Sequence, residues 1–187
     1  MTEQELLYGL RNGEELAFKE LVHLFQDRVF NLSLGLLQQP ADAEDIAQEV
    51  FIQVYRSIQQ FKGEAALATW IYRITTSKCL DQLRSKKRKK RFGFISALFT
   101  TDNTPLYEPE EFNHPGVQLD RKEEAAILFK LVEQLPENQR TAFILNKVEE
   151  LSYREIADIL NTSESAVDSL LQRAKQNLRK KINELPP

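Results

Sequence analysis

Two short segments near the end of the chain carry side chains suited to contact bases in the major groove of DNA. Residues 151–160 and 164–175 each show helical periodicity, and a three-residue turn at residues 161–163 separates them. A helix, a tight turn and a second helix form the arrangement that places a recognition helix in a major groove. The predicted DNA-contacting residues of the second helix are Ser165, Asp168, Ser169 and Gln172, with Arg173 and Lys175 nearer the phosphates.

The chemistry of these side chains matches that of base edges. Val167, Leu171 and Ala174 share one face of the second helix and are expected to pack, which leaves the polar face free. Gln172 can pair in bidentate fashion with adenine, while Asp168 can accept from a cytosine amino group but would repel a nearby phosphate. Ser152 and Glu155 match the S-x-x-E capping box at the start of the first helix. Alone, this motif indicates only that the chain binds DNA.

A dense run of cations lies in the middle of the chain and suits phosphate binding. The whole sequence has a formal net charge of -3. Residues 61–91, however, contain 10 basic and 2 acidic residues (net +8), whereas residues 1–60 contain 4 basic and 10 acidic ones (net -6). Seven of the eight residues from Arg84 to Arg91 are cationic. Such a run indicates a local nucleic-acid surface that contributes affinity and little base information.

No set of residues has the composition of a catalytic or metal site. Cys79 is the only cysteine, so it can form no disulfide within the chain and is expected to be a buried thiol. His23 and His114 are isolated and have no neighbouring nucleophile. The sequence therefore predicts no enzyme activity, no cofactor and no bound metal.

Three helices are expected to form a first domain. Apolar residues recur at spacings of three and four from Glu15 to Leu37, which predicts an amphipathic helix. After a break at Gln39 and Pro40, Asp42 is the predicted N-cap of a second helix that runs to about residue 58 and pairs antiparallel with the first. A loop at residues 61–66 follows, and Thr69 is the predicted N-cap of a third helix over residues 70–90.

The remaining sequence indicates a linker and a second helical domain. We expect domains at residues 1–91 and 119–187, joined by a flexible linker at residues 92–118 that contains several prolines and glycines. Residues 94–99 are too apolar for a plain tether and are candidates for a short helix that docks elsewhere. The predicted fold class is all-α. The sequence shows no signal peptide and no apolar run long enough to span a membrane, so we expect a cytoplasmic protein without membrane insertion.

Four segments together resemble the extracytoplasmic-function sigma factors, a branch of the sigma-70 family. Residues 42–55 resemble the core-binding segment of that family, and residues 61–74 resemble its promoter-melting segment. Residues 135–140 and 151–157 resemble its C-terminal helix-turn-helix domain. The segments stand in the family's order, so their joint occurrence is more specific than any one of them.

This resemblance implies a role for each domain. Residues 1–91 would be sigma region 2, which binds core RNA polymerase and the minus-ten element, and residues 119–187 would be region 4, which binds the minus-thirty-five element. Promoter DNA and core polymerase are then the partners, together with the anti-sigma factor that commonly holds such proteins. The implied polymerase-binding residues are Asp45, Gln48, Glu49, Ile52 and Arg56. The implied minus-ten residues are Phe61, Lys62, Gly63, Glu64, Trp70, Arg73, Ser77, Arg84, Lys87 and Arg88.

A second interpretation stays open at this point. A helix-turn-helix repressor or activator would bind duplex DNA without polymerase. That function would leave the first domain without a role.

Overall fold

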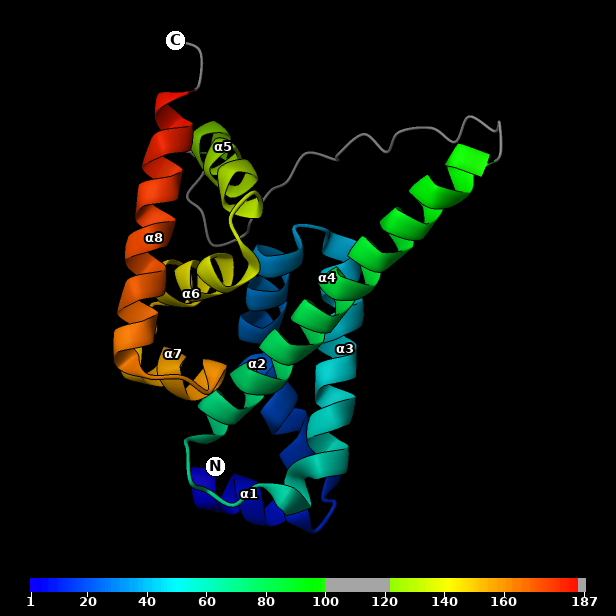
Figure 1. Ribbon diagram of the computed structural model, residues 1–187. Coiled ribbons are helices and arrows are strands. Elements are labelled where there is room, and N and C mark those ends of the chain that lie inside the picture. The colour runs from blue at the N-terminus through cyan, green and yellow to red at the C-terminus, as the bar shows by residue number, and fades with distance from the viewer. Residues whose placement is uncertain (100–121, 185–187) are drawn as a thin grey trace.

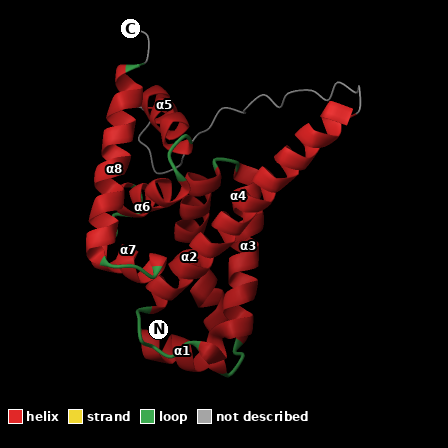
Figure 2. Ribbon diagram, viewed as in Figure 1, coloured by secondary structure: helices red, strands yellow, loops and turns green. Residues whose placement is uncertain are grey.

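The computed structural model describes residues 1–99 and 122–184, with side chains described for residues 1–89 and 127–184. Helices make up the described part of the chain and no strand occurs in it, which confirms the all-α prediction (Figures 1 and 2). The elements are α1 (Glu3–Arg11), α2 (Glu15–Leu37), α3 (Pro40–Ser57), the short 3-10 helix η1 (Ile58–Gln60), α4 (Leu67–Phe99), α5 (Lys122–Glu133), α6 (Glu137–Lys147), α7 (Tyr153–Leu160) and α8 (Glu164–Asn183).

The N-terminal domain is built around α2, which packs against both α3 and α4. The core between these helices contains Leu21, Val29 and Leu32 of α2, Val50 of α3 and Ile71 of α4, and each of these side chains is at most 1% exposed. A short break after α2 turns the chain back, so α2 and α3 run antiparallel as predicted (Figure 1). The predicted bounds of α2 agree with the structure.

Helix α1, which the sequence reasoning did not predict, covers one end of this domain (Figure 1). It spans nine residues and buries only Leu6, Gly9 and Leu10, so its periodicity is too short to detect. The sequence feature that could have indicated this helix is the capping box at its start. The Thr2 side chain accepts from the Glu5 backbone N–H, and Glu5 accepts from the Thr2 backbone N–H.

The start of α3 differs from the prediction that Asp42 would cap it. The helix begins at Pro40 with Gln39 in the N-cap position and no side-chain cap, because proline at the first helical position needs no hydrogen-bond partner for its nitrogen. Asp42 instead lies in the first turn, where its carboxylate accepts from the Lys86 ammonium and the Gln82 amide of α4. The acid therefore joins two helices.

Helix α4 is longer than predicted at both ends. It begins at Leu67, so Thr69 is not its cap but a buried residue inside its first turn. It continues through Phe99 (Figure 1), because lysine and arginine favour helix and the single Gly93 costs only about 1 kcal/mol. Residues 94–99 are thus the end of α4 and not a separate helix. The rest of the predicted linker lies outside the described residues.

The C-terminal domain contains the predicted helix-turn-helix in α7 and α8. Ser152 caps α7, and the predicted capping box with Glu155 is present on both sides. Asn161 adopts a left-handed conformation at φ 51°, which bends the chain sharply after α7. Ser163 then caps α8 by accepting from the Ala166 N–H. These local bonds fix the angle between the two helices.

Loss of the α7 capping box should measurably destabilise the C-terminal domain. Replacing Ser152 by alanine removes an acceptor for a backbone N–H and is expected to lower the free energy of unfolding by about 1 kcal/mol. Urea unfolding followed by circular dichroism measures this loss. Ser152→Thr, which keeps the hydroxyl, is the control and should retain most of the stability. Equal unfolding midpoints for Ser152→Ala and the unchanged protein would contradict the assignment.

The two domains pack against each other in this structure. The end of α2 is buried on every side from Leu32 to Gln38, because α3 and α4 cover one face and α6 contacts the helix as well. Helix α7 contacts the first part of α4 (Figure 1). The Gln38 amide donates to the Phe129 carbonyl at 2.8 Å, which joins α2 to α5. No helix of the described residues is both long and apolar enough to cross a membrane.

Candidate nucleic-acid and polymerase interface

The outer face of α3 carries the predicted polymerase-binding residues, and all of them are exposed. Ile52 is 49% exposed and Tyr55, three residues on, is 53% exposed, so two large apolar side chains lie among charged ones. The Tyr55 ring is held edge-on against Phe18 of α2, with ring centroids 5.4 Å apart. Glu49 accepts from the Lys78 ammonium of α4 at 2.9 Å. An exposed apolar pair on a rigid helix is typical of a protein-binding surface.

Tyr55 was not among the predicted binding residues. Its spacing of three from Ile52 places it on the same face of α3, which was the available signal. Its position beside Ile52 extends the apolar part of this surface.

The loop before α4 is held in place by buried contacts of Phe61 and is exposed at the next three residues. The Phe61 side chain is 5% exposed and packs against the Trp70 indole, with ring centroids 5.1 Å apart. The Arg11 guanidinium donates to the Phe61 carbonyl at 2.8 Å. Lys62, Gly63 and Glu64 are exposed, and Gly63 has a φ of 74° that other residues rarely adopt. Phe61 therefore supports the loop, and the three residues after it present their backbone and side chains to solvent.

The predicted DNA-facing stripe of α4 is half-buried at Trp70 and exposed at Arg73, Ser77 and Arg84, and the C-terminal domain occupies part of it. The Arg73 guanidinium donates to the Asp158 carbonyl of α7 at 2.5 Å. Arg84 pairs with Glu137 of α6 at 2.9 Å and lies 3.5 Å from Asp81 of its own helix. Ser77, on the same stripe, is exposed. Two of the predicted minus-ten contacts are thus engaged by the other domain.

Three cations of the basic run are freely accessible. Lys87, Arg88 and Lys89 are exposed on the second half of α4, whereas Lys86 is half-buried and pairs with Asp42. The side chains of the last two cations of the run lie outside the described residues. The accessible cations form a charged surface on a helix that projects beyond the first domain (Figure 1).

The polar face of α8 points to solvent. Ser165, Ser169, Gln172, Arg173 and Lys175 are exposed and Asp168 is half-buried, while Val167, Leu171 and Ala174 are fully buried as predicted. The Gln172 amide donates to the Asp168 carboxylate at 2.8 Å. The Ser169 hydroxyl donates to the Ser165 carbonyl at 3.0 Å. The recognition face is therefore available and internally hydrogen-bonded.

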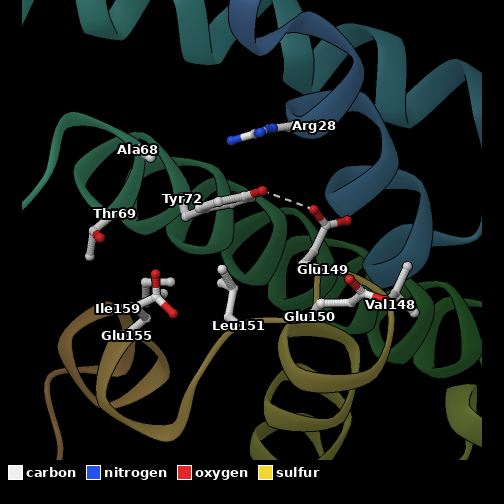
Figure 3. Close-up of a pocket in the computed structure, with 10 residues that line it drawn as sticks. All are labelled: Arg28, Ala68, Thr69, Tyr72, Val148, Glu149, Glu150, Leu151, Glu155 and Ile159. Atoms are coloured by element: carbon white, nitrogen blue, oxygen red, sulfur yellow. Dashed lines mark hydrogen bonds between the residues drawn. The ribbon is translucent and has the colours of Figure 1, made fainter. Parts of the chain in front are cut away.

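A pocket of about 280 Å³ lies where the two domains meet (Figure 3). Tyr72 of α4 points across it, and its hydroxyl donates to Glu149, between α6 and α7, at 2.9 Å. Burial raises the pKa of the Glu149 carboxyl, and burial together with the Glu149 charge raises the pKa of Tyr72. The Tyr72 hydroxyl thus keeps its proton and remains the donor. Arg28 of α2 and Glu155 of α7 also line the pocket.

This contact between the domains is more polar than an ordinary core. Thr76, one turn after Tyr72 on α4, and Arg140 of α6 are both nearly fully buried. The Thr76 hydroxyl and the Arg140 Nε find no hydrogen-bond partner within the described residues. Buried polar atoms without partners cost free energy that water would relieve. These two unpartnered atoms therefore lower the stability of the packed arrangement.

The other chemistry-bearing residues do not assemble into a site. Cys79 is fully buried, and His23 is exposed. Within the described part of the chain, no three histidine, cysteine or acidic side chains gather in a way that could hold a metal ion. His114 lies outside the described residues.

The fold and these surfaces define a class of protein: a helical two-domain DNA-binding protein with a helix-turn-helix in its C-terminal part and a helix with an exposed apolar pair in its N-terminal part. Comparison with known families then narrows the class. Residues 21–89 match the family described as Sigma-70 region 2, and residues 125–178 match Sigma-70, region 4.

Curated relatives match nearly the whole chain. The ECF RNA polymerase sigma-E factor of Haemophilus influenzae is 31% identical over 99% of this chain and 97% of its own. The ECF RNA polymerase sigma factor SigW of Bacillus subtilis is 30% identical over 94% of each chain. The RNA polymerase sigma-H factor of Pseudomonas aeruginosa is 29% identical over 98% of this chain and 95% of its own. The chain belongs to the extracytoplasmic-function family of RNA polymerase sigma factors, which are transcription initiation factors.

Solved structures show the same fold. CnrH, in complex with the cytosolic domain of CnrY, superposes with a TM-score of 0.71 at 17% identity, over 98% of this chain and 99% of that one. RpoE of Bartonella quintana, in complex with the anti-sigma factor NepR, superposes with a TM-score of 0.64 at 19% identity, over 89% and 96% of the two chains.

Proposed function

We propose that this sigma factor docks on core RNA polymerase through the outer face of α3 and contacts promoter DNA at two separate elements. The loop before α4 and the exposed face of α4 would hold the minus-ten element, and α8 would contact the minus-thirty-five element. The observation that carries the assignment of α3 is the exposed Ile52 and Tyr55 pair among charged residues on its outer face. The protein would act in the cytoplasm, with the polymerase supplying all of the catalysis.

At the minus-ten element the loop would present exposed hydrogen-bonding groups to an unstacked base. Phe61 is held by the Trp70 ring and by Arg11, while Lys62, Gly63 and Glu64 are exposed and can hydrogen-bond to a base. A base leaves its stack more readily when a protein pocket returns the stacking and hydrogen bonds that it loses. Trp70 and Arg73 on the adjoining turns of α4 would contact the DNA where its strands separate.

The accessible cations of α4 should contribute salt-dependent affinity and little base preference. Replacing Lys87, Arg88 and Lys89 together by glutamine is expected to reduce the slope of log affinity against log salt by up to about 2.7, if all three contact duplex phosphates at about 0.9 each. Binding of the holoenzyme to promoter DNA over a salt series measures this slope. Lys86→Gln, which removes a cation already paired with Asp42, should change it less. An unchanged slope with altered base preference would refute the assignment.

The arrangement in which the two domains pack against each other, the closed state, must open before both promoter elements can be contacted at once. Arg73 touches the Asp158 carbonyl, and Ser165 follows Asp158 by seven residues, so the backbone of Ser165 lies no more than about 25 Å from that carbonyl. Two elements centred about 25 base pairs apart are separated by about 85 Å along a straight duplex. The two reading surfaces therefore have to move apart when the protein engages polymerase and promoter.

An anti-sigma partner fits the closed state. CnrH and the Bartonella RpoE, which share this fold, were both solved with a bound partner, the latter an anti-sigma factor by description. A partner that held the two domains together would keep Arg73 and Arg84 occupied by the C-terminal domain. By the same geometry, such a partner would block promoter binding without covering α8.

The alternative raised by the sequence, a stand-alone helix-turn-helix regulator, is not favoured, because the chain matches both sigma-70 regions. The two functions differ in what is needed for specific DNA binding. Electrophoretic mobility shift of promoter fragments, with protein alone and with core polymerase added, separates them. We expect specific complexes only when core polymerase is present. Specific, salt-resistant binding by the isolated protein would favour the regulator.

A further inference from the structure

The first two turns of α8 have an unusual chemical balance for a DNA-recognition surface. No lysine or arginine occurs from Glu164 to Gln172, and the polar groups there are two serines, two carboxylates (Glu164 and the half-buried Asp168) and one amide. Guanine presents only acceptors, N7 and O6, to the major groove, and it is most often bound by arginine or lysine. This part of α8 therefore lacks the cationic donors that most often bind guanine.

The donors that do occur are already largely used. The Ser169 hydroxyl donates its single hydrogen to the Ser165 carbonyl at 3.0 Å, which leaves only its lone pairs free. Such a hydroxyl can accept from an amino group but has no hydrogen to offer to a base. Ser165 itself is held 3.0 Å from the Ser163 hydroxyl. The free hydrogen-bonding capacity of this face is thus weighted toward acceptors.

Gln172 is the exception, and its amide is held in one orientation. Its Nε2 lies 2.8 Å from the Asp168 carboxylate, one helical turn earlier. An ionised carboxylate can only accept, so the amide nitrogen and not the amide oxygen must face it. The N–H that points away from Oε1 can serve Asp168, and the other N–H and the Oε1 then lie side by side.

That remaining pair is complementary to one base. Adenine offers the N7 acceptor and an N6 amino donor in the major groove, which match an N–H and an oxygen held side by side. Guanine would place its O6 acceptor against the Oε1, where two lone pairs meet. Asp168 would thus be a positioning residue for Gln172, in place of the direct contact with cytosine that its chemistry alone predicts.

We infer that Gln172 recognises an adenine in the upstream promoter element with an amide oriented by Asp168, and that this pair selects against guanine at that position. The inference rests on the proposed function of α8 and assigns the base preference of the same site. Because the orientation requires a group that only accepts, asparagine at position 168 would free the amide to turn over, although it has nearly the same size and shape.

The test is run-off transcription by the reconstituted holoenzyme on a promoter library whose minus-thirty-five element is randomised, with sequencing of the initiated templates. The variants are Asp168→Ala, Asp168→Asn, Gln172→Ala and the double variant with alanine at both positions. Gln176→Ala is the matched control, because it removes an exposed glutamine one turn further along the same face. We expect the unchanged protein to prefer adenine over guanine at one base pair by about tenfold.

Each variant at position 168 or 172 should lose that preference at the same base pair, and the double variant should lose no more than Gln172→Ala alone. Gln176→Ala should keep it. The inference is overturned if Asp168→Ala and Gln172→Ala change different base pairs, if Asp168→Asn keeps the full preference, or if Asp168→Ala raises initiation equally at every sequence. If the unchanged protein gives no promoter-specific product at all, the proposed function itself fails, which is a separate outcome.

Discussion

Replacing Ile52 by glutamate is expected to weaken binding to core RNA polymerase about a hundredfold, or about 2.8 kcal/mol. The side chain is half exposed on the outer face of α3, so the fold itself does not depend on it. A charge placed in the apolar centre of a protein interface loses its water without gaining a partner, and such a loss typically costs several kcal/mol. Fluorescence anisotropy of the labelled protein titrated with core polymerase measures the change.

The control for this substitution is Ile182→Glu, because Ile182 has nearly the same exposure, 48%, but lies at the end of α8 in the other domain. It should leave the affinity for core polymerase within about threefold, as expected for surface positions outside the binding surface. Equal losses for both variants would mean that the effect follows from the added charge and not from the position. An unchanged affinity for Ile52→Glu would remove α3 from the interface.

Locking the two domains together should abolish initiation at promoters that require both elements. Arg84 and Glu137 touch across the domain boundary at 2.9 Å, so cysteines at these positions can be joined by a short bismaleimide that contains a reducible disulfide. Burial raises the pKa of the native Cys79 thiol to about 12, so that thiol should not react at neutral pH. We expect at least a tenfold loss of run-off product in the cross-linked protein and recovery on reduction.

The two single-cysteine variants, treated with the same reagent, control for the loss of Arg84 and for the added group. Each should have the same activity before and after treatment with the reagent, because nothing ties its domains together. Full initiation by protein that gel electrophoresis shows to be still cross-linked would contradict the requirement for opening.

The parts of the structure that depend on residues close together in the chain could be predicted from the sequence. The capping box of Ser152 and Glu155, the buried face of α8 and the full length of α2 all depend on residues within a few turns of one another, and each agrees with the structure. Local signals were misinterpreted where two residues competed for one role. At α3 the proline at position 40 starts the helix, which leaves Asp42 to pair with Lys86.

The packing between the domains could not be predicted, because it depends on residues far apart in the chain. Tyr72 and Glu149 are separated by 77 positions, and no local sequence pattern around either residue indicates that the two are in contact. One sign was present in retrospect. The end of α2, from Leu32 to Leu37, is apolar on more than one face. A helix that is covered on one side only needs a single apolar face, so this pattern indicates a second covering element.

The predicted site residues also divide into features that local patterns indicate and features that depend on the other domain. The exposed positions on α3, α4 and α8 follow from helical periodicity, but the partners that now occupy Arg73 and Arg84 belong to the other domain. The orientation of Gln172 by Asp168 depends on a spacing of four along α8. Spacing alone does not show whether two such side chains bond to each other or to DNA.

The most direct test of the central claim is run-off transcription by core polymerase with and without this protein, on templates that carry a promoter selected from the library. We expect a single product of defined length only when the protein is present. That product should be lost with Ile52→Glu and retained with Ile182→Glu. Identical products in the two reactions would contradict the claim that this chain directs polymerase to promoters.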